Sequence, residues 1–196
     1  MGNELDFIDN PLSCLEKNDP ILALNVAELT EDKCTKLKII NYFIENLSDE
    51  KNNPYLIGYS LYMKSEYFNG DEKKKILEDA IGYFLKSTSD KKNKIYAKAY
   101  LLYSYYDLER YDDALNIIKN IPRDYFSKKK QRWRDLLTSQ LEICCLIKLG
   151  RLNDLENIIY DYFVSLTKAK DTDVLMPIEL VETLRSIRQV NSAKEH

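Results

Sequence analysis

Apolar and aromatic residues recur at helical spacing along most of this chain, and short polar stretches separate the periodic segments. From Ala97 to Pro122 the sequence AKAYLLYSYYDLERYDDALNIIKNIP contains two such segments around a short break, LERYDDAL. Residues three and four positions apart share one face of an α-helix, so the pattern predicts two helices and a turn. Glycine and proline, at five each, are too scarce for a fold built from many strands and turns.

Polar breaks and capping residues divide the remaining sequence into further helices. Asp19 is expected to cap one helix and Pro20 to occupy its first turn. Asn69-Gly70 is expected to end another helix at Phe68. The expected helices span residues 20–28, 33–47, 55–68, 76–86, 95–108, 111–121, 133–149, 152–166 and 177–190.

These elements predict an all-α protein of about nine or ten helices, paired as antiparallel hairpins because the connections between them are short. We expect one helical domain over residues 1–196. Its parts would be an N-terminal helical hairpin over 1–50, repeat-like units over 54–166, and a C-terminal capping helix with its tail over 172–196.

The segment from Ala97 to Pro122 resembles one unit of the tetratricopeptide-repeat (TPR) family. The packing residues that carry this resemblance are Leu101, Leu102, Tyr105, Tyr111, Ala114, Ile118 and Ile121. Ala80 precedes Ala114 by 34 residues, the period of that family, and Gly58 resembles the small residue of the preceding unit's first helix. The resemblance implies a short right-handed superhelix that binds a protein or peptide.

The flanking units depart from the family pattern. The connection that follows Gly58 is expected to be about ten residues longer than in the family. After the best unit, Leu155 replaces the small residue and follows Ala114 by 41 residues. The resemblance therefore covers about Pro54–Leu166, and another α-solenoid or an irregular helical bundle stays open.

Composition and charge narrow the classes of function. The net charge is −3, and residues 1–50 hold eleven acidic and four basic residues. A mixed surface of this kind argues against a dedicated nucleic-acid-binding protein. The start of the chain lacks the pattern of a signal peptide, apolar runs are too short to span a membrane, and four cysteines follow no disulfide framework. We expect a cytoplasmic and bacterial protein.

Candidate catalytic chemistry is sparse in the sequence. The single histidine is His196, so no histidine-based catalytic pair can form. Cysteines and histidine show no metal-binding spacing, and the glycines form no phosphate-binding loop. The pairs Asp112/Asp113 and Glu78/Asp79 fall at expected helix starts, where favourable interaction with the helix dipole explains them. We expect no enzyme activity, no cofactor and no metal.

Tyrosine is unusually frequent, with fifteen residues against six phenylalanines. If the repeat register of the resemblance holds, it implies six tyrosines on the concave, partner-binding side. These are Tyr55, Tyr59, Tyr62, Tyr96, Tyr103 and Tyr106. Tyrosine suits a recognition surface because a rigid ring carries a hydrogen-bonding tip. The alternative is that the rings are half-buried packing residues.

A basic segment with one tryptophan precedes the expected helix at 133–149. It contains Lys128, Lys129, Lys130, Arg132 and Arg134, with Trp133 among them. Basic and aromatic residues together can hold a nucleic-acid strand, and the same charges could bind an acidic peptide. A solvated connector is the third interpretation.

Three functional hypotheses follow from these patterns. The first is a non-catalytic TPR-like scaffold that binds a protein or peptide partner through the tyrosine-rich groove. The second is an immunity or antitoxin-like protein that neutralises a toxin, suggested by small size and the acidic N-terminal region. The third is a regulator that contacts nucleic acid through the basic segment.

Overall fold

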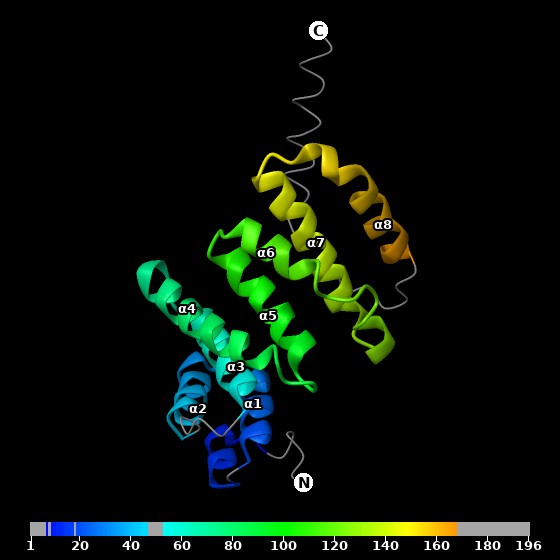
Figure 1. The fold of residues 1–196 in the computed structure, drawn as a ribbon. Helices are drawn as coiled ribbons and strands as arrows, with labels where there is room; N and C mark the ends of the chain where they lie inside the picture. The colour runs from blue at the N-terminus through cyan, green and yellow to red at the C-terminus, as the bar shows by residue number, and fades with distance from the viewer. Residues whose placement is uncertain (1–6, 8, 18, 47–52, 168–196) are drawn as a thin grey trace. The chain divides into compact units, whose positions relative to one another are not determined.

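The computed structural model describes residues 7, 9–17, 19–46 and 53–167. These residues form α-helices and short 3₁₀ helices with no strand among them, which confirms the all-α prediction (Figure 1). Their contacts fall into two compact units, one ending at Ser104 and the other beginning at Tyr105. The expected helix at 177–190, the capping helix and tail at 172–196, and most of the loop at 48–54 lie outside the described residues.

The first unit consists of helices that contact their neighbours in sequence order. A 3₁₀ helix, η2 (Pro11–Lys17), and α1 (Pro20–Leu29) precede α2 (Lys33–Asn46), α3 (Pro54–Ser65) and α4 (Gly70–Ser87). Contacts join α1 to α2, α2 to α3, and most extensively α3 to α4. The unit also includes the first part of α5 (Lys94–Asp107).

Local signals at the helix ends explain where α1 and α2 begin. The Asp19 side chain accepts hydrogen bonds from the Ile21 and Leu22 main-chain N–H groups at 3.0 and 3.1 Å, which confirms the predicted cap. Asp32 caps α2 by accepting from the Thr35 N–H at 2.7 Å. Hydrogen bonds from Thr35 lower the pKa of the Asp32 carboxyl.

The structure corrects the expected boundary between α3 and α4. Helix α3 ends at Ser65, and Asn69-Gly70 lies at the start of α4 instead of capping α3. Gly70 is at φ 59°, a left-handed conformation that suits glycine. Asp71 and Glu72 then occupy the first turn of α4, where acidic residues stabilise the helix N-terminus.

The prediction of a long loop after Gly58 is therefore wrong. Only residues 66–69 separate α3 from α4, and the extra residues form additional helix at the start of α4. The lysines of this stretch, Lys73, Lys74 and Lys75, belong to α4, where Lys74 and Lys75 are exposed. Their exposed side chains remain hydrated, so the helix can extend over a polar stretch without burying charge.

Small residues allow close packing between α3 and α4. A Cβ built on Gly58 would lie 2.9 Å from two ring carbons of Phe84, which is closer than ordinary van der Waals contact. Phe84 and Ala80 of α4 are fully buried. Gly58 thus lies where two helices approach, as expected for a small residue at a helix crossing.

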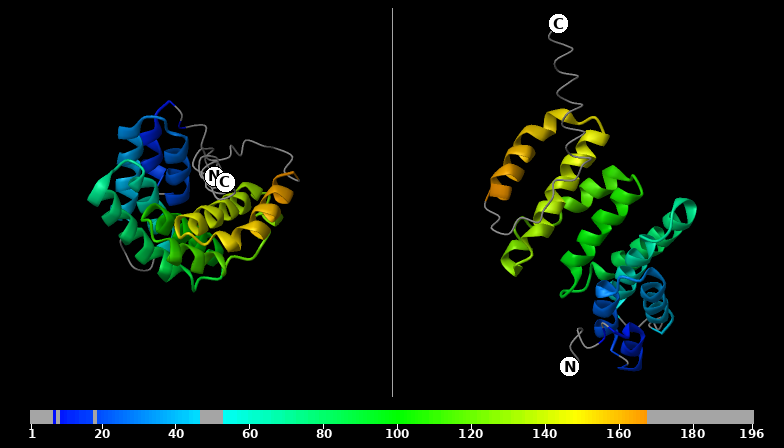
Figure 2. Two further views of the ribbon diagram at one scale, coloured as in Figure 1. Left: turned by 90° about the horizontal axis from the view of Figure 1, so that it is seen from above. Right: turned by 180° about the vertical axis from the view of Figure 1, so that it is seen from behind.

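The second unit contains α6 (Tyr111–Ile118), the 3₁₀ helix η3 (Ser127–Lys129), α7 (Arg132–Lys148), the 3₁₀ helix η4 (Leu152–Asp154) and α8 (Leu155–Thr167). Helix α6 contacts α7, and α7 contacts α8; the last two lie side by side in Figures 1 and 2. Ala114 is fully buried on α6, and Leu155 is buried at the start of α8. The sequence predicted that this helix ends at Ile121, whereas α6 ends at Ile118 and residues 119–121 form a turn and a bend.

Candidate functional site

Helices α3 and α5 bring tyrosine rings of the first unit together. The ring of Tyr100 is 4.9 Å from that of Tyr59 and 5.3 Å from that of Tyr62, measured between centroids. Tyr62 is 6.3 Å from Tyr103, and Tyr55 is 6.4 Å from Tyr96. Five of the six candidate tyrosines therefore join one aromatic cluster.

Tyr100 is the central ring of this cluster, and the sequence analysis missed it. Its ring stacks on Phe84 with centroids 5.5 Å apart. Tyr100 follows Tyr96 by four residues, one helical turn, so helical spacing alone could have indicated it. The repeat register assigned the concave side to other positions and passed over this one.

The rings of the cluster expose only part of their surface. Tyr103 is 6% exposed, and Tyr55, Tyr59, Tyr62 and Tyr96 are half-buried. The Tyr59 hydroxyl donates a hydrogen bond to the Glu28 carboxylate at the end of α1. Burial, the neighbouring Tyr100 and then Glu28 raise the pKa of Tyr59. Much of each ring is thus used in packing, and contact with a partner stays a prediction.

Tyr106, the sixth candidate, belongs to the second unit. It is half-buried, and its ring lies 5.8 Å from that of Tyr111 in an edge-to-face arrangement. Tyr106 thus belongs to a different unit from the five tyrosines of the aromatic cluster.

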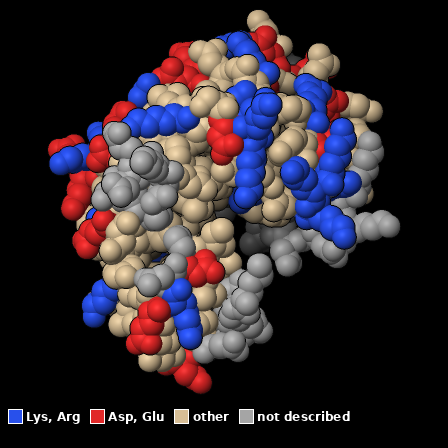
Figure 3. Space-filling model, turned by 60° about the horizontal axis from the view of Figure 1, so that its bottom comes forward, with Lys and Arg blue, Asp and Glu red and all other residues tan. Residues whose placement is uncertain are grey.

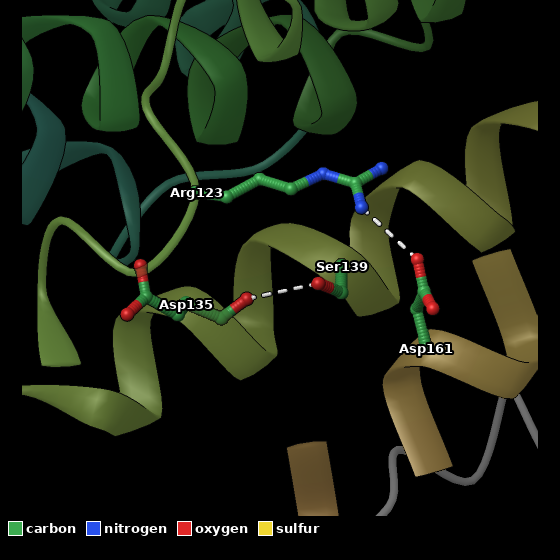
Figure 4. A network of polar contacts seen from close by, with 4 residues as sticks. All are labelled: Arg123, Asp135, Ser139 and Asp161. Carbon is green, nitrogen blue, oxygen red and sulfur yellow. Dashed lines mark hydrogen bonds and ion pairs between the residues drawn. The ribbon is translucent and has the colours of Figure 1, made fainter. Parts of the chain in front are cut away.

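In the second unit, Asp135 of α7 organises the connector between α6 and α7. Its carboxylate accepts hydrogen bonds from the Phe126 N–H at 3.3 Å, the Ser127 N–H at 2.6 Å and the Ser127 hydroxyl at 2.6 Å. The ring of Phe126 is fully buried. One turn further along α7, the Ser139 hydroxyl donates to the Asp135 main-chain oxygen at 3.2 Å (Figure 4). The connector is thus held by specific contacts.

A groove of about 780 Å³ lies among this connector, the end of α6, α7 and α8. Residues from all four segments line it, and every lining residue belongs to the second unit. The apolar lining residues are Ile118, Ile121, Pro122, Leu136, Ile158 and Val164. The charged ones are Lys119, Arg123, Asp124, Lys128, Arg132, Asp135, Glu142 and Asp161.

Arg123 interacts across this groove with two carboxylates from different helices, those of Asp161 on α8 and Glu142 on α7. The Arg123 guanidinium forms an ion pair with Asp161 of α8 at 3.0 Å, and Figure 4 shows its side chain extending from the connector toward that helix. Both side chains are largely exposed, at 81% and 56%, so the pair contributes little to stability. Burial raises the pKa of the Glu142 carboxyl, and the charge of Arg123 partly opposes this shift.

The structure divides the basic segment into separate environments. Lys128 and Arg132 line the groove. Lys129 is exposed with its Nζ 5.2 Å from the Tyr125 ring centroid, and Lys130 is exposed at φ 60°. Arg134 is half-buried as a residue, and its guanidinium lies over the adjacent indole ring at 4.3 Å from the ring centroid. The five cations therefore do not form one continuous strip.

The surface charges of the face drawn in Figure 3 are mixed, with basic and acidic side chains interspersed over it. Among the described residues, no group of three or more His, Cys, Asp or Glu side chains is arranged to hold a metal ion. Within that same part of the chain, no helix has the length and apolar character needed to cross a membrane. Comparisons with protein-family models, with curated proteins and with solved structures find no match for this chain.

Proposed function

We propose that this protein is a non-catalytic module that binds a segment of another protein, and that the groove of the second unit is its principal contact surface. The observation that carries the proposal is the groove's size and lining. Its volume of about 780 Å³ falls within the range of ordinary ligand pockets, roughly 300–1,000 Å³. The apolar lining residues that are at least partly exposed are Pro122, Ile158 and Val164. Together with the charged groups they suit a peptide, which presents both kinds of side chain.

The charged groups of the groove support binding better than they support catalysis. Asp135 is occupied by the connector's N–H groups, and Asp161 is paired with Arg123. Because these two carboxylates are held by such contacts, they can orient a ligand more readily than they can act on it chemically. The TPR-like organisation and the tyrosine-rich surface of the first unit remain part of the proposal, with the tyrosines as secondary contacts. A cytoplasmic location fits cysteines that follow no disulfide framework.

The test uses two tryptophan variants on the same helix. Ser165→Trp places a large ring at a position that lines the groove, whereas Asn157→Trp places the same ring at an exposed position of α8 outside it. Circular dichroism and thermal unfolding establish that both variants fold. A photo-crosslinking amino acid introduced at either position then reports which surface a partner contacts in a cell lysate.

We expect partner proteins to be retained by the unmodified chain and by Asn157→Trp, and to be lost by at least tenfold with Ser165→Trp. Crosslinks should form from position 165 and be absent from position 157. Equal retention by both tryptophan variants would contradict the groove assignment, because a ring in the groove must displace a bound segment.

A further inference from the structure

The two sides of the groove carry different charges. The connector side, together with the first residue of α7, supplies Lys119, Arg123, Lys128 and Arg132, against one acid, Asp124. The helical side supplies only acids, on α7 and α8. A bound segment would therefore meet a basic wall and an acidic wall.

The acidic wall is largely compensated within the protein. Asp135 accepts three hydrogen bonds from the connector. Asp161 is paired with Arg123. Glu142 is half-buried, and its burial favours the neutral form of the carboxyl. In the basic wall Arg123 is likewise paired, with Asp161, whereas the Lys119 and Lys128 side chains are exposed.

Resting on the proposed function, we propose that the segment bound in this groove is an acidic peptide whose carboxylates contact Lys119 and Lys128 and whose apolar side chains contact the partly exposed Ile158 and Val164. Carboxylates complement the exposed ammonium groups of Lys119 and Lys128, and this complementarity accelerates encounter and fixes orientation. Apolar side chains of the peptide gain free energy by leaving water at the groove's apolar surface.

A nucleic-acid strand fits the same groove poorly. Single strands bind by stacking bases on aromatic rings, and no aromatic side chain is among the described residues that line this groove. Trp133 lies outside the lining, and the guanidinium of Arg134 already covers its ring.

The experiment selects peptides without bias and then tests their charge requirement. A displayed library of random 12-residue peptides is selected on the full chain, and selected peptides are measured by fluorescence anisotropy. Lys119→Glu/Lys128→Glu reverses the basic wall. Lys91→Glu/Lys92→Glu makes the same change of net charge at exposed positions of the first unit and serves as the matched control.

We expect enrichment of peptides that combine Asp or Glu with Leu or Ile. Their affinity should fall at least tenfold in the Lys119/Lys128 variant, change less than twofold in the Lys91/Lys92 variant, and weaken as salt is raised from 50 to 500 mM. The contacts at the basic wall are partly exposed, so salt should screen them.

The other outcomes separate this inference from the proposed function. Neutral or basic peptides that bind and are lost with Ser165→Trp would overturn the acidic partner and leave the groove function standing. Peptides unaffected by Ser165→Trp, or a selection that enriches none, would overturn both. A 12-residue oligothymidylate that binds and is lost in the Lys119/Lys128 variant, with no peptide bound, would also overturn the acidic peptide in favour of nucleic acid.

Discussion

Gly58→Ala and Gly82→Ala make the same chemical change in two helix interiors and are expected to have opposite effects on stability. Alanine is favoured over glycine in a helix by about 1 kcal/mol, so propensity alone predicts that both changes stabilise the protein. The two sites differ in space. A Cβ at Gly82 meets no atom within 4 Å, whereas a Cβ at Gly58 would lie 2.9 Å from ring carbons of Phe84.

The magnitude at Gly58 follows from how firmly Phe84 is held. Carbon atoms pack at about 3.5–4.0 Å, so the ring must move by roughly half an ångström or more. Phe84 is fully buried and stacks on Tyr100, which leaves it little freedom to move. Overpacking a core typically costs about 1–3 kcal/mol. After the gain in helix propensity, Gly58→Ala should lower the free energy of unfolding by as much as about 2 kcal/mol.

Urea denaturation followed by circular dichroism measures the effect. Gly82→Ala should raise the free energy of unfolding by about 0.5–1 kcal/mol. In a Phe84→Leu background the smaller, more flexible side chain should remove most of the penalty of Gly58→Ala, and the double-mutant cycle reports the coupling. If Gly58→Ala stabilises the protein as much as Gly82→Ala does, the close approach of α3 and α4 is refuted.

Three further predictions concern thiols, a buried hydrogen bond and a cap. Cys34 is exposed and the other cysteines are buried, and burial, Cys144 and Glu142 raise the pKa of the Cys145 thiol to about 12. A thiol reagent at pH 8 should therefore modify one thiol quickly in the folded protein and all four only in denaturant. A second thiol that reacts quickly in the folded protein would contradict this prediction. The buried Gln140 amide donates to the Tyr162 hydroxyl at 2.6 Å, so Tyr162→Phe should cost about 1–3 kcal/mol in urea denaturation. Adding Gln140→Leu should restore part of that loss, and no recovery would argue against an unsatisfied amide as the cause. Asp19→Ala removes the cap of α1 and should cost about 1 kcal/mol, whereas Asp19→Asn should cost less than half as much in the same assay.

Local features of the fold were predictable because they depend on neighbouring residues. Helical spacing indicated the described helices, and Asp19 marked the start of α1 because its carboxylate needs only the next three residues. The Asn69-Gly70 pair was misassigned because the same residue types suit the end of one helix or the start of the next. Its role followed from the acidic residues after it, which extend α4 toward the N-terminus.

The amino-acid sequence by itself determined the all-α class, the order of the helices and the small residue, Gly58, at a close helix approach. Only the tertiary structure decided the site. The groove depends on contacts between distant positions: Asp135 holds the connector eight and nine residues before it, and Arg123 reaches Asp161 38 residues later. Helical periodicity encodes which face of a helix is apolar, but not how a connector folds between two helices. Hence the sequence indicated the basic segment as a candidate binding site, and the structure showed that, of its five cations, only Lys128 and Arg132 line a groove.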